Sequence, residues 1–246
     1  MKNQTKTKPQ SRIERAEKVW TPDSKLYIPH EDKEITFAYP SFGPDTYQSV
    51  GKQILEHNLE ISTAEQTASL LYSAYFSDEK NEPEFENIRK IMRNRWFVVF
   101  NRNLSTDKGI YVVQDNEARR LSEQLSVNDL EKRLKNGKEI KGIEVRISED
   151  GIVRFAPKGS YILGEQTSEQ LSKDGFAIAS YGKKGAENLA EISEQFRYQP
   201  RVWGLDVKDK KPELRLSALD EFNDWLLVDG DYFDDYGNGH AFGVLK

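Results

Sequence analysis

The stretch RWFVVFN, residues 95–101, is the most strongly β-forming segment of this 246-residue chain. β-branched and aromatic residues favour strands, and the stretch is too short for a core helix. Side chains alternate between the two faces of a strand, so Phe97 and Val99 lie on one face and Val98 lies on the other. Both faces are apolar, which is typical of a central strand that is covered on both sides. The sequence therefore predicts a buried central strand at this point.

The segments around this strand supply further strands and helices. Residues 109–113 repeat the β-forming pattern after the loop LSTDK, which predicts a hairpin with the central strand. Apolar residues recur with a period near 3.6 before the strand, and there Ser62 and Glu65 predict a capping box at a helix start. A further helix is expected over residues 116–134, with Ser126 as a point where it can break and cap a second segment together with Asp129.

Four short strands are expected after residue 200, and strands and helices do not alternate regularly along the chain. This order favours an α+β fold, with helices packed on a mostly antiparallel sheet and a β-rich C-terminal third. The predicted organisation is a flexible basic tail over residues 1–20, an α+β region over 21–160 and a second α+β region over 161–246. A single domain after the tail is the alternative that the sequence leaves open.

The composition excludes several classes of protein. The chain has no cysteine, so disulfides, thiol nucleophiles and cysteine-ligated zinc are excluded. No apolar run approaches the roughly 20 residues that span a bilayer, and residues 1–18 contain no apolar core of a secretory signal. We therefore expect a soluble, cytoplasmic protein without a membrane partner.

The net charge of −5 is unevenly distributed along the chain. Residues 1–20 contain six Lys or Arg against two Glu. A second basic group precedes the central strand and its aromatic residues, and it consists of Arg89, Lys90, Arg93 and Arg95. Cationic residues beside aromatic residues are typical of surfaces that bind nucleic acid. The alternative is an ordinary solvated surface, because the aromatic residues belong to a strand that is expected to be buried.

A motif with two glycines, SYGKKGAENLAEI, covers residues 180–192. Glycines let the backbone approach a phosphate closely, and the N-terminus of a helix offers free N–H groups. The candidate phosphate-binding residues are Gly182, Lys183, Lys184 and Gly185.

Three interpretations of this motif remain open. In the first, GFAIA is a strand before a degenerate dinucleotide-binding loop, and Asp206 is the acidic residue that meets a ribose hydroxyl. In the second, the loop resembles the GxxG loop of KH domains, which bind single-stranded nucleic acid along its backbone. This resemblance covers about a dozen residues and departs from the family at Asn188, where an apolar residue is expected. In the third, Gly182 ends one element in a left-handed conformation, the lysines are solvated, and Gly185 relieves crowding before a helix.

An acidic segment near the C-terminus, VDGDYFDDYGNGHAFGV, contains candidate metal ligands. They are Asp229, Asp231, Asp234, Asp235 and His240. Carboxylate oxygens are the ligands that Ca²⁺ and Mg²⁺ prefer, so these residues are candidates for binding a divalent cation, although the EF-hand spacing fails in every register. The alternative is a solvated loop between two strands, in which the acidic residues prevent the strand edges from pairing with other chains.

These observations favour a non-catalytic, intracellular protein that binds single-stranded nucleic acid or a ribonucleoprotein surface. The alternative is a nucleotide- or metal-dependent enzyme that uses Gly182–Gly185 for phosphates and the acidic residues of Asp229–Asp235 for a divalent cation. A second alternative is a structural or assembly protein that binds a protein partner through its N-terminal tail. The sequence assigns no catalytic residue.

Overall fold

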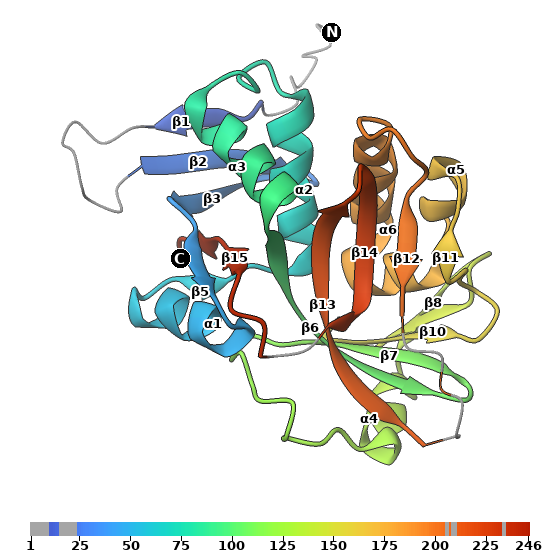
Figure 1. Cartoon of the computed structure of the whole chain (residues 1–246). Helices are drawn as coiled ribbons and strands as arrows, with labels where there is room; N and C mark the ends of the chain where they lie inside the picture. Colours follow the sequence, from blue (N-terminus) through green and yellow to red (C-terminus); the bar gives the residue numbers. More distant parts are fainter. Residues whose placement is uncertain (1–9, 15–23, 205–206, 208–210, 233–234) are drawn as a thin grey trace, which may run out of the picture.

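Two sheets and six helices form the part of the chain that the computed structural model describes, which is residues 10–14, 24–204, 207, 211–232 and 235–246 (Figure 1). The helices are α1 (Tyr47–Glu56), α2 (Ala64–Phe76), α3 (Pro83–Asn94), α4 (Val127–Leu134), α5 (Ser168–Leu171) and α6 (Gly175–Ser193). The strands are β1 (Arg12–Glu14), β2 (Ser24–His30), β3 (Lys33–Tyr39), β4 (Phe42–Asp45), β5 (Glu60–Ile61), β6 (Trp96–Thr106), β7 (Gly109–Gln114), β8 (Lys138–Ile140), β9 (Val145–Ile147), β10 (Val153–Pro157), β11 (Gly164–Glu165), β12 (Arg201–Trp203), β13 (Glu213–Phe222), β14 (Trp225–Tyr232), β15 (Gly239–Ala241) and β16 (Gly243–Val244).

Most strand pairs are antiparallel. The large sheet has the order β11-β12-β14-β13-β6-β7-β10-β9-β8, and β15 and β4 join it beside β6. The small sheet has the order β1-β2-β3-β16-β5. Among the described residues, only β12 with β14 and β15 with β6 pair in parallel. The predicted α+β fold, with helices on a mostly antiparallel sheet and a β-rich C-terminal third, is confirmed. A boundary near residue 160 would cut through the large sheet, because β13 pairs with β6.

The stretch RWFVVFN begins β6, which lies between β13 and β7 in the large sheet. Phe97, Val98, Val99 and Phe100 are each at most 1% exposed. Phe97 and Val99 belong to the main core, which α2, α3 and α6 complete. Val98 and Phe100 belong to a second core on the opposite face, which α1 covers. The buried central strand and its hairpin with β7 are therefore confirmed, because apolar side chains on both faces find a packing layer.

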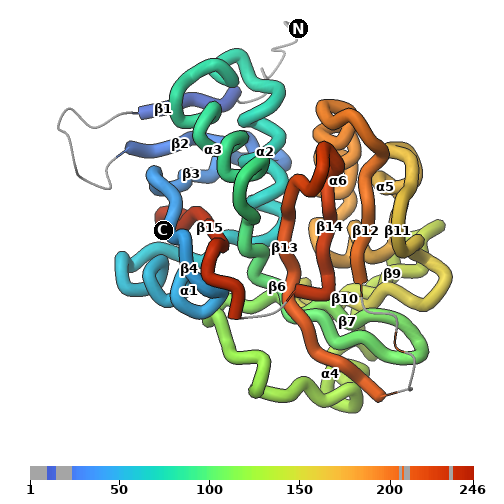
Figure 2. Tube along the Cα trace, viewed as in Figure 1, coloured from blue at the N-terminus to red at the C-terminus, as the bar shows by residue number. Residues whose placement is uncertain are grey.

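The C-terminal strand β16 is held in the small sheet between β3 and β5. Phe242 and Val244 are 2% and 5% exposed, so the end of the chain contributes to the core. Figure 2 shows β4 beside β15 and next to α1. β15 also pairs with β6, and this pairing connects the region with the large sheet. No helix of the described ranges is long and apolar enough to cross a membrane.

The capping box at the start of α2 is formed by Thr63 and Gln66, and the prediction of Ser62 and Glu65 is wrong by one residue. Ser62 is buried, and its hydroxyl oxygen lies 3.3 Å from that of Thr67. The hydroxyl of Ser62 is therefore engaged inside the core, and the next residue, Thr63, caps the helix instead.

The helix expected over residues 116–134 is helical only in α4, so its first half is wrong. Asp115 accepts hydrogen bonds from the backbone N–H groups of Glu117 and Arg119 at 3.1 and 2.7 Å. Ala118 between them has a φ of 51°. Local bonds from a side chain to the backbone compete with helix formation, so this segment turns instead.

The segment GFAIA is the start of α6 and not a strand. Asp174 caps the helix, because its carboxylate accepts hydrogen bonds from the N–H groups of Phe176 and Ala177 at 2.9 and 3.0 Å. A dinucleotide-binding loop needs a strand before its glycines, so that interpretation loses its first element. Asp206, its expected ribose ligand, lies outside the described residues.

Candidate functional site

Gly182 interrupts α6 and divides it into two helical segments. Its φ of 68° and ψ of 169° fall in a region that is open essentially to glycine alone. A Cβ atom here would come within 2.2 Å of Glu65 Oε1. A Cβ atom at Gly185 would come within 2.9 Å of the Cβ atom of Tyr181. Both glycines are therefore required by the local packing of α6.

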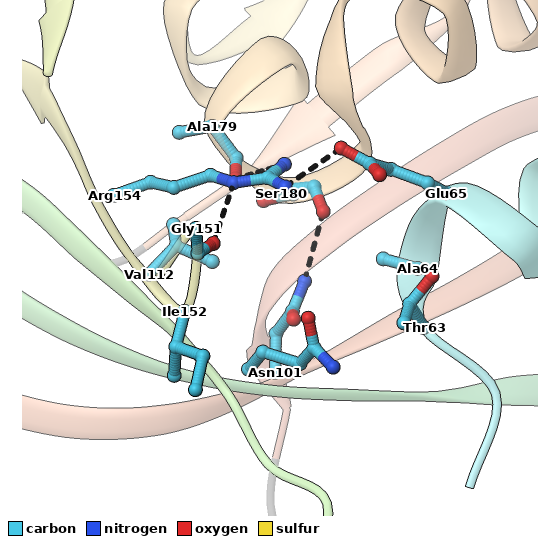
Figure 3. A pocket seen from close by; sticks show the side chains of 11 residues that line it. Thr63, Ala64, Glu65, Asn101, Val112, Gly151, Ile152, Arg154, Ala179 and Ser180 are labelled. Carbon is cyan, nitrogen blue, oxygen red and sulfur yellow. Dashed lines mark hydrogen bonds and ion pairs between the residues drawn. The ribbon is translucent and has the colours of Figure 1, made fainter. Parts of the chain in front are cut away.

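Two side chains from the sheet bind carbonyl oxygens at this interruption (Figure 3). Asn101 Nδ2 donates to the oxygen of Ser180 at 3.2 Å, and Arg154 Nη1 donates to the oxygen of Ala179 at 3.5 Å. Arg154 also pairs with Glu65 at 2.7 Å, and these two side chains are only 15% and 29% exposed. The space between these groups is about 10 Å³, which is room for one water molecule. This crevice joins α6 and α2 to the sheet and is too small for a larger ligand.

The lysines of the motif lie on the surface beside acidic residues. Lys183 and Lys184 are exposed, and Lys184 Nζ lies 3.5 Å from Glu187 Oε2. The carboxylate of Glu65 lies against Gly182, at the point where a phosphate would approach the backbone. This geometry agrees with the interpretation in which the glycines serve helix packing. Phosphate binding by these residues stays a prediction.

The predicted basic group before β6 is divided between structural and exposed side chains. Arg89 donates to two main-chain carbonyl oxygens, in α2 and in the loop before α3, and thereby fixes that connection. Lys90 Nζ lies 4.0 Å from a carboxylate oxygen one helical turn away, whereas Arg93 and Arg95 are exposed. Among the described residues, no hydrogen bond or ion pair joins this group to the lysines of the glycine motif. Nucleic-acid binding by either group stays a prediction.

Two of the predicted metal ligands lie on β14. Asp231 pairs with Arg215, whose Nε lies 3.0 Å from Asp231 Oδ1. Asp229 Oδ1 accepts a hydrogen bond from the backbone N–H of Asp231 at 2.8 Å. Arg215 therefore already neutralises one of these two carboxylates.

The other predicted metal ligands do not gather around this pair. His240 Nδ1 lies 3.1 Å from Ser41 Oγ, and burial, together with the nearby Arg95, lowers the pKa of the imidazole. Asp235 is exposed, and Asp234 lies outside the described residues. Within the residues that the structure places, no three His, Asp or Glu side chains are arranged to hold a metal ion. A divalent cation site in this segment stays a prediction.

On β12, β14 and the end of β13, one face of the large sheet carries no helix, whereas the same face at Val98 of β6 and Ala218 of β13 lies in the second core with α1. The other face of the sheet packs on α6, where a Cβ atom at Gly230 would meet the ring of Phe176 at 2.3 Å. In Figure 1, α6 and α5 lie behind these strands, and no helix lies in front of them. Residues that are paired across adjacent strands share a face. The register therefore places the following side chains on the helix-free side, called here the open face: Trp96, Arg201, Trp203, Asp220, Phe222, Trp225, Leu227 and Asp229.

Aromatic side chains are strongly exposed on and beside the open face. Trp203 and Phe222 are 51% and 56% exposed. Tyr198 and Tyr236 are also exposed, and they pack against tryptophan rings of the open face at centroid distances of 5.8 and 6.0 Å. These four are half of the eight large hydrophobic side chains that are exposed in the described part of the chain. Exposed apolar patches of this kind mark interaction sites.

A cation is already bound by one ring of the open face. The guanidinium carbon of Arg201 lies 3.7 Å from the centre of the Trp225 ring, within the distance of a cation–π interaction. Arg201 Nη2 also lies 3.6 Å from Glu165 Oε2 on the neighbouring strand β11. On the open face, the Arg201 guanidinium is therefore held between the Trp225 ring and the Glu165 carboxylate.

Two carboxylates of the open face have no such partner. Asp220 and Asp229 are partly buried, and this burial raises the pKa of each carboxyl to about 7. Repulsion from Asp229 contributes further to the raised pKa of Asp220. No Lys or Arg side chain within the described ranges forms an ion pair with either carboxylate. Desolvation without a counter-charge disfavours the ionised form, which explains the direction of both shifts.

Sequence reasoning assigned Asp229 to a metal site and did not assign the rest of the open face. The signal that was available is the alternation in WLLVD, where Trp225, Leu227 and Asp229 alternate with buried Leu226 and Val228. This alternation indicates a strand with one solvated face. Its neighbours could not be inferred, because β12 pairs with β14 in parallel across 21 intervening residues between Trp203 and Trp225.

No family model and no curated protein matches this sequence. A solved structure described as "Accommodation of massive sequence variation in Nanoarchaeota by the C-type lectin fold" is similar to it, with a TM-score of 0.47 and 14% sequence identity. The alignment covers 84% of this chain and 96% of that chain.

Proposed function

We propose that this protein is a non-catalytic binding protein that holds a basic segment of a protein partner on its open face. The observation that carries this proposal is the pair Asp220 and Asp229, two partly buried carboxylates without a cationic partner in the described residues, set among exposed aromatic rings. Titratable groups with a strongly perturbed pKa are often found at functional sites. There the free-energy cost of burying the charge is accepted because the group binds a ligand.

A cation from a partner would complete this arrangement. An opposite charge within about 4–6 Å favours the ionised carboxylate and offsets the cost of its burial. Trp203, which is 51% exposed, lies beside Asp229 in the register and can receive a Lys or Arg side chain on its ring. Trp96, beside Asp220, packs against the rings of Tyr232 and Tyr236. Arg201 on Trp225 is an example of the same interaction within the chain.

The surface chemistry favours a protein partner at this face. Trp, Tyr and Arg dominate the residues that contribute most to protein–protein binding, and Trp203, Tyr198 and Arg201 gather here. A polyanion would meet Asp220 and Asp229, whose negative charges repel phosphate groups. This function corresponds to the structural or assembly alternative, with the open face as the binding surface.

Tryptophan fluorescence tests the proposal at the site itself, because Trp96, Trp203 and Trp225 are three of the four tryptophans of the chain. The probe is a short peptide that repeats Gly-Lys-Gly-Leu, and the matched peptide repeats Gly-Glu-Gly-Leu. We expect saturable binding of the lysine peptide alone. The double variant Asp220→Asn/Asp229→Asn should bind it about tenfold more weakly, equal to about 1.4 kcal/mol.

A charge-matched control separates the open face from the net charge of the chain. Glu139→Gln/Glu149→Gln removes two exposed carboxylates elsewhere and should bind the lysine peptide like the unmodified protein. Equal affinity of both double variants would overturn the assignment of this face.

A further inference from the structure

A hydroxyl and an imidazole meet beside the start of β6, at a place that the open face does not include. Ser41 immediately precedes β4, and His240 lies in β15. β15 pairs with β4 on one side and with β6 on the other, so the three strands are neighbours. Ser41 Oγ lies 3.1 Å from His240 Nδ1, within hydrogen-bond distance.

The register places Arg95 on the same face of the sheet as His240. His240 is paired with Phe97 across the parallel strands β15 and β6, so these two side chains lie on one face. Arg95 is extended, with a φ of −146° and a ψ of −164°, and it stands two residues before Phe97, on that face. The positive charge of Arg95 contributes to the lowered pKa of the His240 imidazole, which independently shows that the two groups are close.

Both the guanidinium and the imidazole keep donors that a ligand can reach. Arg95 is exposed and forms no ion pair with a carboxylate of the described residues. His240 Nε2 has no hydrogen-bond partner within the described ranges, yet it is not one of the unpaired polar atoms that are fully buried there. Nε2 is therefore accessible to solvent.

The chemistry of these groups suits a phosphate group. A guanidinium can bind two phosphate oxygens at once, and hydrogen bonds to a charged acceptor are the strong ones. A neutral imidazole whose Nδ1 accepts the proton of a serine hydroxyl carries its own proton on Nε2, which makes Nε2 a donor. No carboxylate of the described residues contributes to the pKa of His240, so no negative side chain already occupies these donors.

We infer that Arg95 and His240 bind the phosphate group of a small phosphate monoester. The guanidinium and the Nε2–H group donate to the phosphate oxygens, and Ser41 is a positioning residue that donates to Nδ1 and thereby selects the imidazole tautomer. Nucleic acid is held through several phosphate contacts, whereas one arginine stands here. The site lies on the face of β6 opposite to Trp96 and the open face, so it is independent of the binding of a basic segment.

Nuclear magnetic resonance of the full chain, labelled with ¹³C and ¹⁵N, tests this site through the three histidines. The variant His240→Gln identifies the signal of His240. Titration with phenyl phosphate at about pH 7.5 should move that signal saturably, with half-saturation at about 1 mM, and should leave His30 and His57 in place. The absence of a saturable shift at His240 would overturn the inference.

Two variants separate a specific site from general attraction by positive charge. Arg95→Gln should weaken the binding of phenyl phosphate about tenfold. The matched control Arg120→Gln removes an exposed guanidinium between β7 and α4 and should bind like the unmodified protein. Equal affinity of the two variants would overturn the inference.

The ¹⁵N shifts of the imidazole test the role of Ser41. The unmodified protein should carry the proton on Nε2, and Ser41→Ala should lose this preference and bind phenyl phosphate more weakly. A proton on Nδ1 in the unmodified protein would overturn the assignment of Ser41.

Two further ligands distinguish the source of the phosphate group. Inorganic phosphate carries the same dianion and should move the same signal, whereas a shift with inorganic phosphate alone would overturn the assignment to an ester. Single-stranded RNA that moves the signal at a lower phosphate concentration than phenyl phosphate would assign the site to nucleic acid and also overturn it.

Discussion

Replacing Asp229 by asparagine should make the protein more stable, and the gain should grow with pH. The pKa of this carboxyl is about 7 in the folded protein and 3.8 in its unperturbed state. Between these values the folded state binds more protons than the unfolded state, so the free energy of unfolding falls as pH rises. This contribution is fully favourable below pH 4 and is lost as pH rises to about 7. The asparagine side chain of the variant would be neutral throughout, and its amide oxygen can still accept the N–H of Asp231.

The magnitude follows from the shift of roughly 3 pKa units, at about 1.4 kcal/mol per unit. Relative to the unmodified protein, Asp229→Asn should raise the free energy of unfolding by about 2 kcal/mol at pH 5 and about 4 kcal/mol at pH 8. These values are upper limits, because water and side chains relax around a charge. In a chain of this size, the growth of the gain between pH 5 and pH 8 corresponds to about 5 °C in Tm.

Urea unfolding followed by circular dichroism at pH 5, 6, 7 and 8 measures this gain directly. Asp129→Asn is the matched control, because Asp129 is exposed and its pKa is lowered by Lys132 and Ser126. The control should show no gain that grows between pH 5 and pH 8. A gain from Asp229→Asn that is the same at pH 5 and pH 8, or a loss of stability at pH 8, would refute the argument that burial raises this pKa.

Three further predictions concern α6 and its contacts. Gly182→Ala should lower the free energy of unfolding by about 2–4 kcal/mol in urea titrations, because the new Cβ atom would clash with the Glu65 side chain and alanine would be strained at this φ. A loss below about 0.5 kcal/mol would contradict the backbone geometry at Gly182. Arg154→Ala should lower the free energy of unfolding by about 2–4 kcal/mol. The double variant Glu65→Ala/Arg154→Ala should lose less than the sum of the two single variants, and additive losses would contradict an energetic coupling between the two side chains. Lys183→Ala/Lys184→Ala should change the free energy of unfolding by less than about 0.5 kcal/mol. The nucleic-acid prediction is tested with the same variant, by fluorescence anisotropy with single-stranded RNA at two salt concentrations. Salt-sensitive binding that is lost in this variant would make the glycine motif a phosphate site.

The parts of the fold that the sequence predicts are those in which local pattern and burial agree. RWFVVFN is apolar on both faces, so its position between two packing layers follows from alternation alone. The hairpin with β7 follows from a short turn between two β-forming runs. Only the hairpin partner β7 lies close along the chain, whereas β13 and the helices that cover β6 come from distant segments.

The errors come from single side chains that compete with a local pattern. GFAIA is short and apolar, and such a run suits a strand or a buried helix equally. Asp174 decides for the helix by binding the first free N–H groups of α6. Asp115 prevents a helix at the residues that follow it, because its carboxylate binds their N–H groups and holds them in a turn.

The open face was not predicted from the sequence, because it depends on contacts between distant segments. Asp220 and Asp229 lie on one face through the register of β13 and β14, and Trp203 joins them through the parallel pairing of β12. No spacing within the sequence encodes these neighbours.

Proton release on binding tests the open face most directly. At pH 7, carboxyls with a pKa of about 7 are about half protonated, and a bound cation shifts them to the ionised form. Isothermal titration of the Gly-Lys-Gly-Leu peptide in two buffers of different ionisation enthalpy measures the protons that are released. We predict that the unmodified protein releases about 0.5–1 proton and that Asp220→Asn/Asp229→Asn releases none. Binding without proton release, or with equal release from both proteins, would contradict it.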